Sequence, residues 1–310
     1  MTLFYTIFKI KCNIFCFPHL KGNQNLKTMK YFILVLTSFI FSLSIYAKNG
    51  NQPVSIQVTG KGKPIVLIPG FTVPGNIWNP IVKKLEKNYE CHIVTLAGFG
   101  GKDPIKFPWL NKVNESLKNY IIKNDLQNAT IIGHSLGGTI ATWLAAQKDI
   151  KLSKIILIDA LPASGALMIP DFKPENLIYE SPYNNQQLAM DYVTFEQTAT
   201  VMAKGMSLKK SAQEKIKNWI LESDRKTYVY GYTDYLKLDL REDLKNISIP
   251  VTIIAASQPY GKKMVKQTYK SQYANLKDYN FIIAEDSAHF IMLDKPEWFL
   301  KQVQTILLSK

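Results

Sequence analysis

Short, mostly apolar segments alternate with amphipathic ones along most of this chain. Seven segments of four to six residues are bounded by polar or turn-forming residues, a length and composition typical of strands. They lie at residues 54–58, 64–68, 91–96, 130–133, 154–158, 251–255 and 280–283. Apolar residues at helical spacing occupy 76–87, 111–123, 136–147, 262–274 and 296–308. Alternation of this kind predicts a mostly parallel sheet with helices on both faces, the α/β class.

One interval interrupts this alternation. About ninety residues separate the strand ending near Ile158 from the strand beginning at Val251, and a structureless loop of that length is rare in a compact domain. The interval is rich in Tyr, Met and helix-forming residues. We therefore expect a helical insertion at about 163–239, within a single domain that spans 48–310.

The N-terminal part has the pattern of an export signal. Met29 and Lys30 precede an apolar run from Tyr31 to Tyr46, and Ala47 stands before a polar segment. This order predicts a signal peptide at 29–47, cleaved after Ala47, and a periplasmic or secreted protein with no stable membrane partner after cleavage. A retained membrane anchor is the alternative. Residues 1–28 precede this start and are interpreted as an upstream extension of the reading frame.

The number of cysteines and the distribution of charge indicate the cellular compartment and the type of partner. Only Cys91 follows the predicted signal, so the exported chain cannot form an internal disulfide, which suits a bacterial periplasm. The formal net charge is +14, but five lysines and no acidic residue precede residue 48, so the remainder carries +9. The basic residues are spread out rather than grouped, which favours a solvated surface over nucleic-acid binding.

A glycine-flanked serine lies between a predicted strand and a predicted helix. Gly133-His134-Ser135-Leu136-Gly137 has the spacing G-x-S-x-G at a strand-to-helix turn. Such a turn requires small residues two positions before and two after the serine, because strand and helix pass close together. The turn would raise the Ser135 hydroxyl above the sheet edge and direct the N-terminus of the following helix toward it. Ser135 is therefore the predicted nucleophile.

Elimination selects a base for this serine. The chain has four histidines, of which His19 precedes the signal, His92 begins a strand and His134 adjoins the serine within the turn. Only His289 follows the last predicted strand, at the edge of the sheet where Ser135 should lie. His289 is the predicted general base.

Together these segments resemble the α/β-hydrolase superfamily, specifically its capped, esterase-like members, from about Val54 onward. Ile68-Pro69-Gly70-Phe71 resembles the loop that follows the family's third strand, with Pro69 where histidine is common. The resemblance implies an oxyanion hole made by the backbone amides of Phe71 and Leu136. Ser287-Ala288-His289-Phe290 resembles the loop that carries the catalytic histidine.

The third member of the expected triad departs from the family pattern. Most relatives have an Asp after the strand at 251–255, whereas this chain continues Ala256-Ser257-Gln258-Pro259-Tyr260-Gly261. Asp159, at the end of the strand at 154–158, is the predicted substitute, in an arrangement that resembles pancreatic-type lipases. Asp239, Glu285, Asp286, a turn-capping role for Asp159, and a Ser-His dyad remain alternatives.

Together these features predict an exported serine hydrolase that cleaves an ester-like bond through an acyl-enzyme on Ser135. Aromatic and Met residues of the insertion would line an apolar pocket for a small, partly hydrophobic substrate, with a role for half or more of the aromatic residues in the core of the cap as the alternative. These are Tyr179, Tyr183, Tyr192, Phe195, Met202, Met206, Tyr228, Tyr230, Tyr232 and Tyr235. No metal-ligand spacing, phosphate loop or dinucleotide motif is found, so no metal or cofactor is expected. Perhydrolase or carbon-carbon hydrolase chemistry, or a non-catalytic ligand-binding role, is the alternative.

Overall fold

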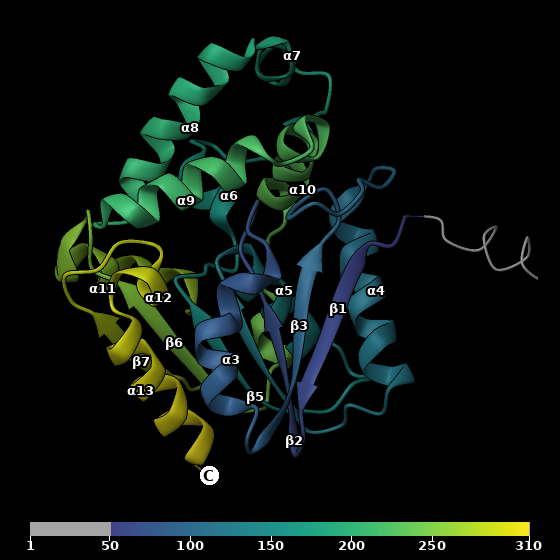
Figure 1. Cartoon of the computed structure of the whole chain (residues 1–310), viewed down its shortest axis with the longest axis vertical. Helices are drawn as coiled ribbons and strands as arrows, with labels where there is room; N and C mark the ends of the chain where they lie inside the picture. The colour runs from purple at the N-terminus through teal and green to yellow at the C-terminus, as the bar shows by residue number, and fades with distance from the viewer. Residues whose placement is uncertain (1–50, 310) are drawn as a thin grey trace, which may run out of the picture. The chain divides into compact units, whose positions relative to one another are not determined.

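The computed structural model describes residues 51–309, so the predicted signal peptide at 29–47 and the extension at 1–28 lie outside the described residues. The described chain contains a seven-stranded sheet with helices on both faces (Figure 1). Its strands are β1 (Val54–Gly60), β2 (Lys63–Ile68), β3 (Tyr89–Leu96), β4 (Ala129–His134), β5 (Leu152–Ile158), β6 (Val251–Ala256) and β7 (Asn280–Ala284). All seven predicted strands are confirmed, with ends that differ by one or two residues.

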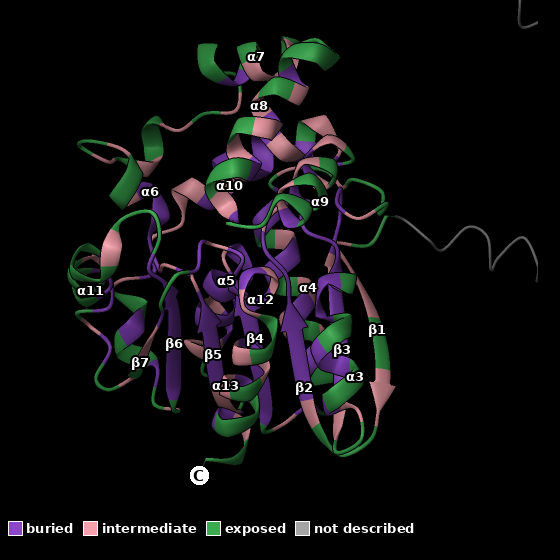
Figure 2. Ribbon diagram, turned by 60° about the vertical axis from the view of Figure 1, so that its left-hand side comes forward, coloured by how far each residue is buried: buried purple, intermediate pink, exposed green. Residues whose placement is uncertain are grey.

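The strand order is β1-β3-β2-β4-β5-β6-β7, and the sheet is parallel except for β1, which pairs antiparallel with β3. The central strands β4 and β6 are buried along their whole length, because helices cover both of their faces (Figure 2). The edge strand β1 is only partly buried. The chain therefore places its continuous apolar segments in the middle of the sheet.

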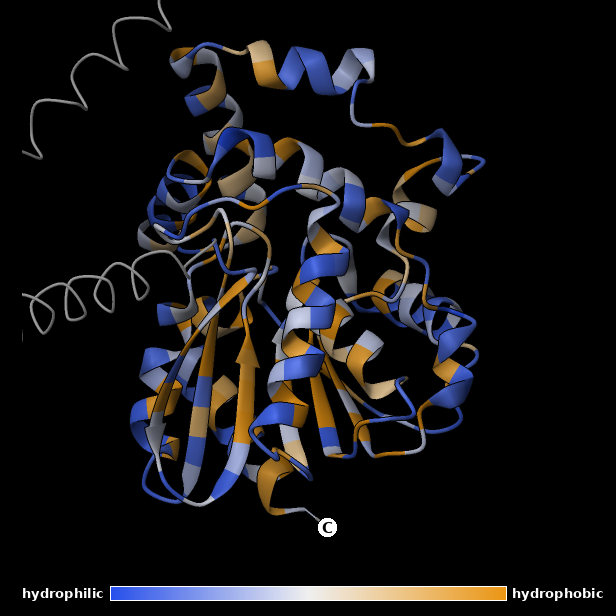
Figure 3. Cartoon of the chain, turned by 90° about the vertical axis from the view of Figure 1, so that its right-hand side faces the viewer, coloured by the Kyte–Doolittle hydropathy of each residue, from blue (hydrophilic) through white to orange (hydrophobic). Residues whose placement is uncertain are grey.

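Two hydrophobic clusters lie on opposite faces of this sheet. Alternate residues of β2 belong to different clusters: Val66 and Ile68 face one side, and Ile65 and Leu67 face the other. The first face is covered by α4 (Trp109–Lys123), α5 (Leu136–Ala145) and α11 (Gly261–Gln272). The second is covered by α3 (Asn79–Leu85), α12 (Ile291–Asp294) and α13 (Pro296–Leu308). Figure 3 shows hydrophobic strands between helices whose outer surfaces are hydrophilic.

The helical insertion between β5 and β6 is also confirmed, and we call it the cap. It contains α6 (Ser164–Met168), η2 (Pro174–Asn176), α7 (Pro182–Ala189), α8 (Tyr192–Met206), α9 (Lys210–Leu221), η3 (Thr227–Gly231) and α10 (Tyr232–Lys237), and η4 (Asp243–Asn246) leads back to the sheet. The cap lies beyond the carboxyl ends of the parallel strands (Figure 1). Within residues 51–309, no helix is long and apolar enough to cross a membrane.

Candidate active site

Ser135 occupies a strained turn at the end of β4. Its backbone has φ 53° and ψ −124°, in the region that non-glycine residues rarely adopt, and its amide donates to Ile158 O at 2.9 Å. A Cβ on Gly133 would lie 2.2 Å from Gly137 O, and a Cβ on Gly137 would lie 2.2 Å from Ile68 O. The predicted requirement for small residues on both sides of Ser135 therefore has a direct steric cause.

The two residues predicted to form the oxyanion hole belong to the two elements that meet at Gly137, the start of α5 and the loop after β2. Leu136 is the first residue of α5, so its amide has no acceptor within that helix. Phe71 follows the end of β2, and the first turn of α5 packs against that same loop through Gly137. Both amides thus belong to elements that meet at Ser135, where the N-terminal end of α5 favours negative charge.

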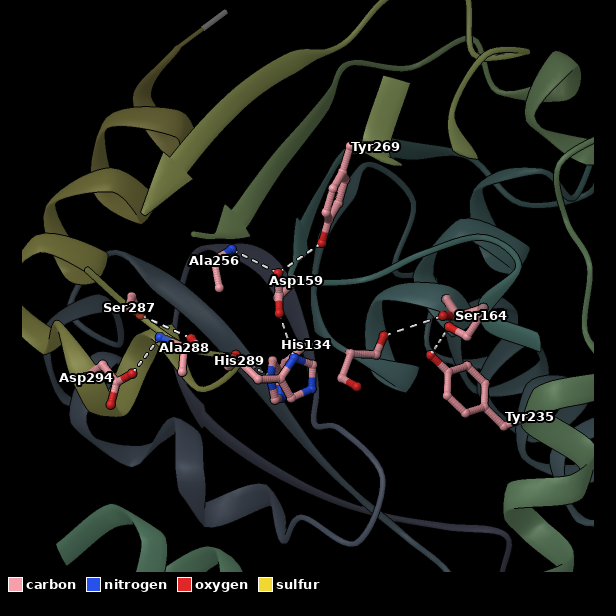
Figure 4. A network of polar contacts seen from close by, with 12 residues as sticks. His134, Asp159, Ser164, Tyr235, Ala256, Tyr269, Ser287, Ala288, His289 and Asp294 are labelled. Carbon is pink, nitrogen blue, oxygen red and sulfur yellow. Dashed lines mark hydrogen bonds and ion pairs between the residues drawn. The ribbon is translucent and has the colours of Figure 1, made fainter. Parts of the chain in front are cut away.

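His289 and Asp159 form a hydrogen-bonded pair at the same edge of the sheet. His289 lies in the loop after β7, and its Nδ1 is 2.7 Å from Asp159 Oδ2 (Figure 4). The two side chains are mostly buried, with 27% and 17% of their surfaces exposed. The structure thus brings the predicted base and the predicted acid together. With Nδ1–H donated to a carboxylate, Nε2 is the ring nitrogen left to accept a proton.

The second oxygen of Asp159 has partners of its own. Asp159 Oδ1 accepts from the backbone amide of Ala256 at 2.9 Å and from the hydroxyl of Tyr269 at 3.0 Å. Ala256 ends β6, the strand after which most relatives carry their acid, and Tyr269 belongs to α11. Neither donor was anticipated from the sequence, because nothing in the local pattern of Ala256 or Tyr269 indicates that a carboxylate from β5 lies beside it.

The alternative acids are engaged elsewhere. Asp239 pairs with Arg241, whose guanidinium lowers the pKa of that carboxyl, and Glu285 forms an ion pair with Lys262, which lowers its pKa as well. Asp286 is exposed. Among the carboxylates of residues 51–309, Asp159 is the one in contact with the His289 ring.

A second histidine supports the first. The His134 ring is fully buried and packs against the His289 ring at 4.6 Å between centroids, and its Nε2 is 3.1 Å from His289 O. Burial, and then the charge of His289, hold the pKa of His134 well below its usual value. The neutral ring can donate from Nε2 to the His289 carbonyl, so His134 supports the loop of the predicted base. Nothing in the sequence pattern around His134 indicates this role.

The loop of His289 is also tied to the cap through Asp294. Asp294 Oδ2 accepts from the Ala288 amide at 2.8 Å, and its other oxygen accepts from Ser207 Oγ at 2.5 Å and from the Leu208 amide at 3.0 Å. Asp294 lies in the segment that follows the histidine loop. The acidic residue five positions after His289 is the one sequence signal from which this contact could have been anticipated.

The Ser135 side chain lies between the sheet edge and the cap. Within residues 51–309, no hydrogen bond joins Ser135 Oγ to the His289 ring, whose Nδ1 is hydrogen bonded to Asp159. Catalytic hydrogen bonds are often long in substrate-free enzymes and form in the substrate complex. The substrate-free geometry is therefore compatible with the predicted pairing of Ser135 and His289.

Cap aromatic residues cover the loop that carries Phe71. The Phe71 ring lies 5.4 Å from that of Tyr232 and 6.1 Å from that of Tyr228, between centroids. Of the aromatic residues in the insertion, Tyr183 and Tyr192 are largely exposed, whereas Phe195, Tyr230 and Tyr235 are buried. Within residues 51–309, no group of three or more His, Cys, Asp or Glu residues is arranged to hold a metal ion.

Comparisons with known proteins agree with this fold. Residues 63–296 match the model of the family described as the alpha/beta hydrolase fold. A pimeloyl-(acyl-carrier protein) methyl ester esterase of Aeromonas hydrophila is 23% identical over 261 residues, covering 81% of this chain and 98% of that protein. Its counterpart from Vibrio cholerae is 25% identical over 201 residues, covering 63% of this chain and 75% of that protein.

Solved structures show the same fold. An enol-lactonase from Burkholderia xenovorans has a TM-score of 0.68 at 15% identity, covering 83% of this chain and 96% of that chain. An esterase from Exiguobacterium antarcticum has a TM-score of 0.65 at 18% identity, with the same coverage. At such identities the likeness concerns the fold alone.

Proposed function

Because the chain belongs to the α/β-hydrolase fold family, we propose that it is a serine esterase that forms an acyl-enzyme on Ser135. That it is a hydrolase follows from the family and from its esterase relatives. The observation that carries the serine mechanism is the His289–Asp159 hydrogen bond of 2.7 Å at the edge of the sheet where Ser135 occupies its strained turn.

The reaction begins when Ser135 Oγ attacks the ester carbonyl while His289 Nε2 accepts its proton. The new C–O bond converts the carbonyl oxygen to an oxyanion, which the amides of Phe71 and Leu136 stabilise at the N-terminal end of α5. His289 then protonates the alkoxy oxygen, the ester C–O bond breaks and the alcohol leaves. His289 next accepts a proton from a water molecule as that water attacks the acyl carbon. It passes this proton to Ser135 Oγ as the bond between Ser135 and the acyl group breaks and the carboxylic acid leaves.

Asp159 keeps His289 in the tautomer that this sequence requires. Its Oδ2 accepts the Nδ1 proton, and its charge stabilises the imidazolium formed during attack. Because Asp159 follows β5 rather than β6, the triad acid comes from the strand next to that of the nucleophile. Support for this assignment comes from the other carboxylates, since Asp239 and Glu285 are paired with basic residues elsewhere.

The substrate class is a small ester with a partly hydrophobic group. Two lines of support are the aromatic cap side chains around Phe71 and the relatives named for a methyl ester. Export to the periplasm, with the signal peptide at 29–47, is part of the same proposal and rests on the sequence pattern.

Labelling with a fluorophosphonate tests the proposal, because only an activated serine reacts with this probe. The expected result is one label per chain, found on the peptide that contains Ser135, with no label on Ser135→Ala. Cleavage of short-chain esters should disappear in the same variant while its melting temperature is kept. A wild-type protein that neither takes the label nor cleaves esters would refute the serine mechanism.

A further inference from the structure

The carbonyl groups of the loop of His289 are held from the side of the sheet. The His289 carbonyl lies 3.1 Å from Nε2 of His134, in the turn of Ser135. The Ser287 carbonyl accepts from the amide of Gln258, which follows β6, at 3.0 Å. These two contacts hold the loop relative to the ends of the central strands.

The amide groups on either side of His289 are held from the side of the cap. The Phe290 amide donates to the carbonyl of Met206, the last residue of α8, at 3.0 Å. The Ala288 amide donates to Asp294 Oδ2 at 2.8 Å (Figure 4). The first of these hydrogen bonds joins the loop to the cap directly, and the second does so through the other oxygen of Asp294.

That oxygen binds the turn between α8 and α9, residues 206–209, which we call the α8–α9 turn. Asp294 Oδ1 accepts from the Ser207 hydroxyl at 2.5 Å and from the Leu208 amide at 3.0 Å. Ser207 is itself fixed within the turn, because its Oγ accepts from the Lys209 amide at 3.2 Å. One carboxylate thus joins the α8–α9 turn to the residue that precedes His289.

This connection is buried. Asp294, Ser207 and Ala288 are all shielded from solvent, and the ring of Phe290 packs on that of Trp219 in α9, with 6.2 Å between centroids. None of the ion pairs among residues 51–309 includes Asp294. A buried carboxylate without a basic partner depends on its hydrogen-bond donors. The turn and the loop therefore cannot separate without leaving this carboxylate short of donors.

We propose that Asp294 is a positioning residue, through which the α8–α9 turn of the cap sets the position of His289 relative to Ser135. Its two oxygens are taken by the turn and by the loop, so it acts through His289 and not on the ester. A displacement of about 1 Å in a catalytic group can lower a rate about 100-fold. A link that holds the backbone beside His289 therefore matters for kcat. This inference rests on the proposed serine mechanism.

The experiment cuts the link from each end. Asp294→Asn keeps the size of the side chain, but its amide nitrogen cannot accept, so the hydrogen bonds to the loop or those to the turn are lost. Ser207→Ala removes only the hydroxyl at the cap end. On a short-chain ester, Asp294→Asn should lower kcat about 10- to 100-fold and Ser207→Ala about three- to tenfold. KM should stay within about threefold in both, because neither side chain binds the ester.

Ser223→Ala is the matched control for Ser207→Ala. Ser223 is also a buried serine of the cap, beyond the other end of α9, and its hydroxyl donates to Trp219 O at 2.7 Å. Each variant loses the hydrogen bond that one buried hydroxyl donates, so their melting temperatures should fall by similar amounts. Only Ser207→Ala should lower kcat.

Two further measurements separate positioning from stability. The double variant Asp294→Asn/Ser207→Ala should be no slower than Asp294→Asn alone, because both substitutions cut the same link. Proton NMR follows the proton between His289 Nδ1 and Asp159, whose signal broadens when the 2.7 Å hydrogen bond lengthens and the proton exchanges with water. This signal should broaden in Asp294→Asn and in Ser207→Ala and stay sharp in Ser223→Ala.

Three results would overturn the assignment of Asp294. A folded Asp294→Asn protein with wild-type kcat and an unchanged proton signal would show that His289 does not need the link. Losses that multiply in the double variant would mean that the two residues do not act through one link. An equal loss of kcat in Ser223→Ala and Ser207→Ala would trace the effect to a weakened cap, and this comparison decides even if Asp294→Asn does not fold.

The same assays keep this inference apart from the proposed function. In each of those three results the wild type still cleaves esters and takes the fluorophosphonate label, so the serine mechanism stands. An unlabelled, inactive wild type would refute the serine mechanism and this inference with it.

Discussion

The sheet edge and the cap contribute to the site in different ways. At the sheet edge, Ser135, Asp159 and His289 each follow a strand, and their positions are fixed by the backbone ladder of β4, β5, β6 and β7. The cap instead reaches the site through side chains such as Tyr232, whose ring lies 5.4 Å from that of Phe71 between centroids. Substitution of one of these three residues should therefore cause a large loss of catalytic rate. Substitution of one cap residue should lower the rate much less.

The largest expected effect is at Ser135. Ser135→Ala should lower kcat roughly 10³- to 10⁶-fold, because the group that forms the covalent intermediate is gone. The fold should be kept, since alanine fits wherever the serine side chain does. Ester hydrolysis and circular dichroism measure the two properties. Wild-type turnover by a folded Ser135→Ala protein would move the chemistry away from the sheet edge.

The next effect is at Asp159. Asp159→Asn should lower kcat roughly 10²- to 10⁴-fold with a small change in melting temperature, because an amide cannot hold His289 in the required tautomer. Asp239→Asn is the matched control, since its carboxylate bonds to Arg241 away from the site. If Asp239→Asn lost more activity than Asp159→Asn, Asp159 would not be the triad acid.

Substitution of Tyr269 tests whether the function of Asp159 depends on the hydrogen bonds that its Oδ1 accepts. Tyr269→Phe removes one of two donors to Asp159 Oδ1 and should lower kcat by about 10- to 150-fold at most, the worth of one hydrogen bond to a charged group. Tyr273→Phe is the control, because this phenol stacks beside Tyr269 but donates to Ala160 O. Steady-state kinetics on one ester measures both. Similar losses in the two variants would indicate a packing effect.

Most of the sheet edge could be predicted from the sequence because its signals are local. A glycine two residues on either side of Ser135, a histidine after the last strand and an acid after β5 are each visible within a few positions. Asp159 was favoured because the segment after β6 has no carboxylate, and the structure supplies the Ala256 amide there instead.

The contacts of the cap could not be predicted in this way. Tyr235 and Ser164 are 71 residues apart in the chain, and Tyr269 and Asp159 are 110 apart, so no periodicity links them. The composition indicated an aromatic cap but not which of its side chains are buried, since Tyr183 is exposed while Tyr235 is buried. Side-chain orientation in a helical insertion depends on packing between helices, which residue types alone do not determine.

The smallest expected effect concerns stability at the sheet edge rather than catalysis. Burial holds the pKa of His134 well below its ordinary value of 6.5, so the folded protein binds fewer protons there than the unfolded chain at acidic pH. This contribution to the free energy of unfolding is complete above pH 6.5 and is lost as the pH falls, by up to about 1.4 kcal/mol per pH unit for one proton.

Calorimetry between pH 8 and pH 5 should therefore show a melting temperature that begins to fall near pH 6.5 in the wild type. His134→Gln should remove much of this slope, because a glutamine amide can still donate to His289 O but does not titrate. The ion-paired carboxyls of Asp239 and Glu285 do not interfere, since their lowered pKa values place their protonation below this range. If the melting temperature depended on pH equally in the two proteins, groups other than His134 would cause the loss of stability in acid. If the dependence were confined to the wild type, His134 would be its cause.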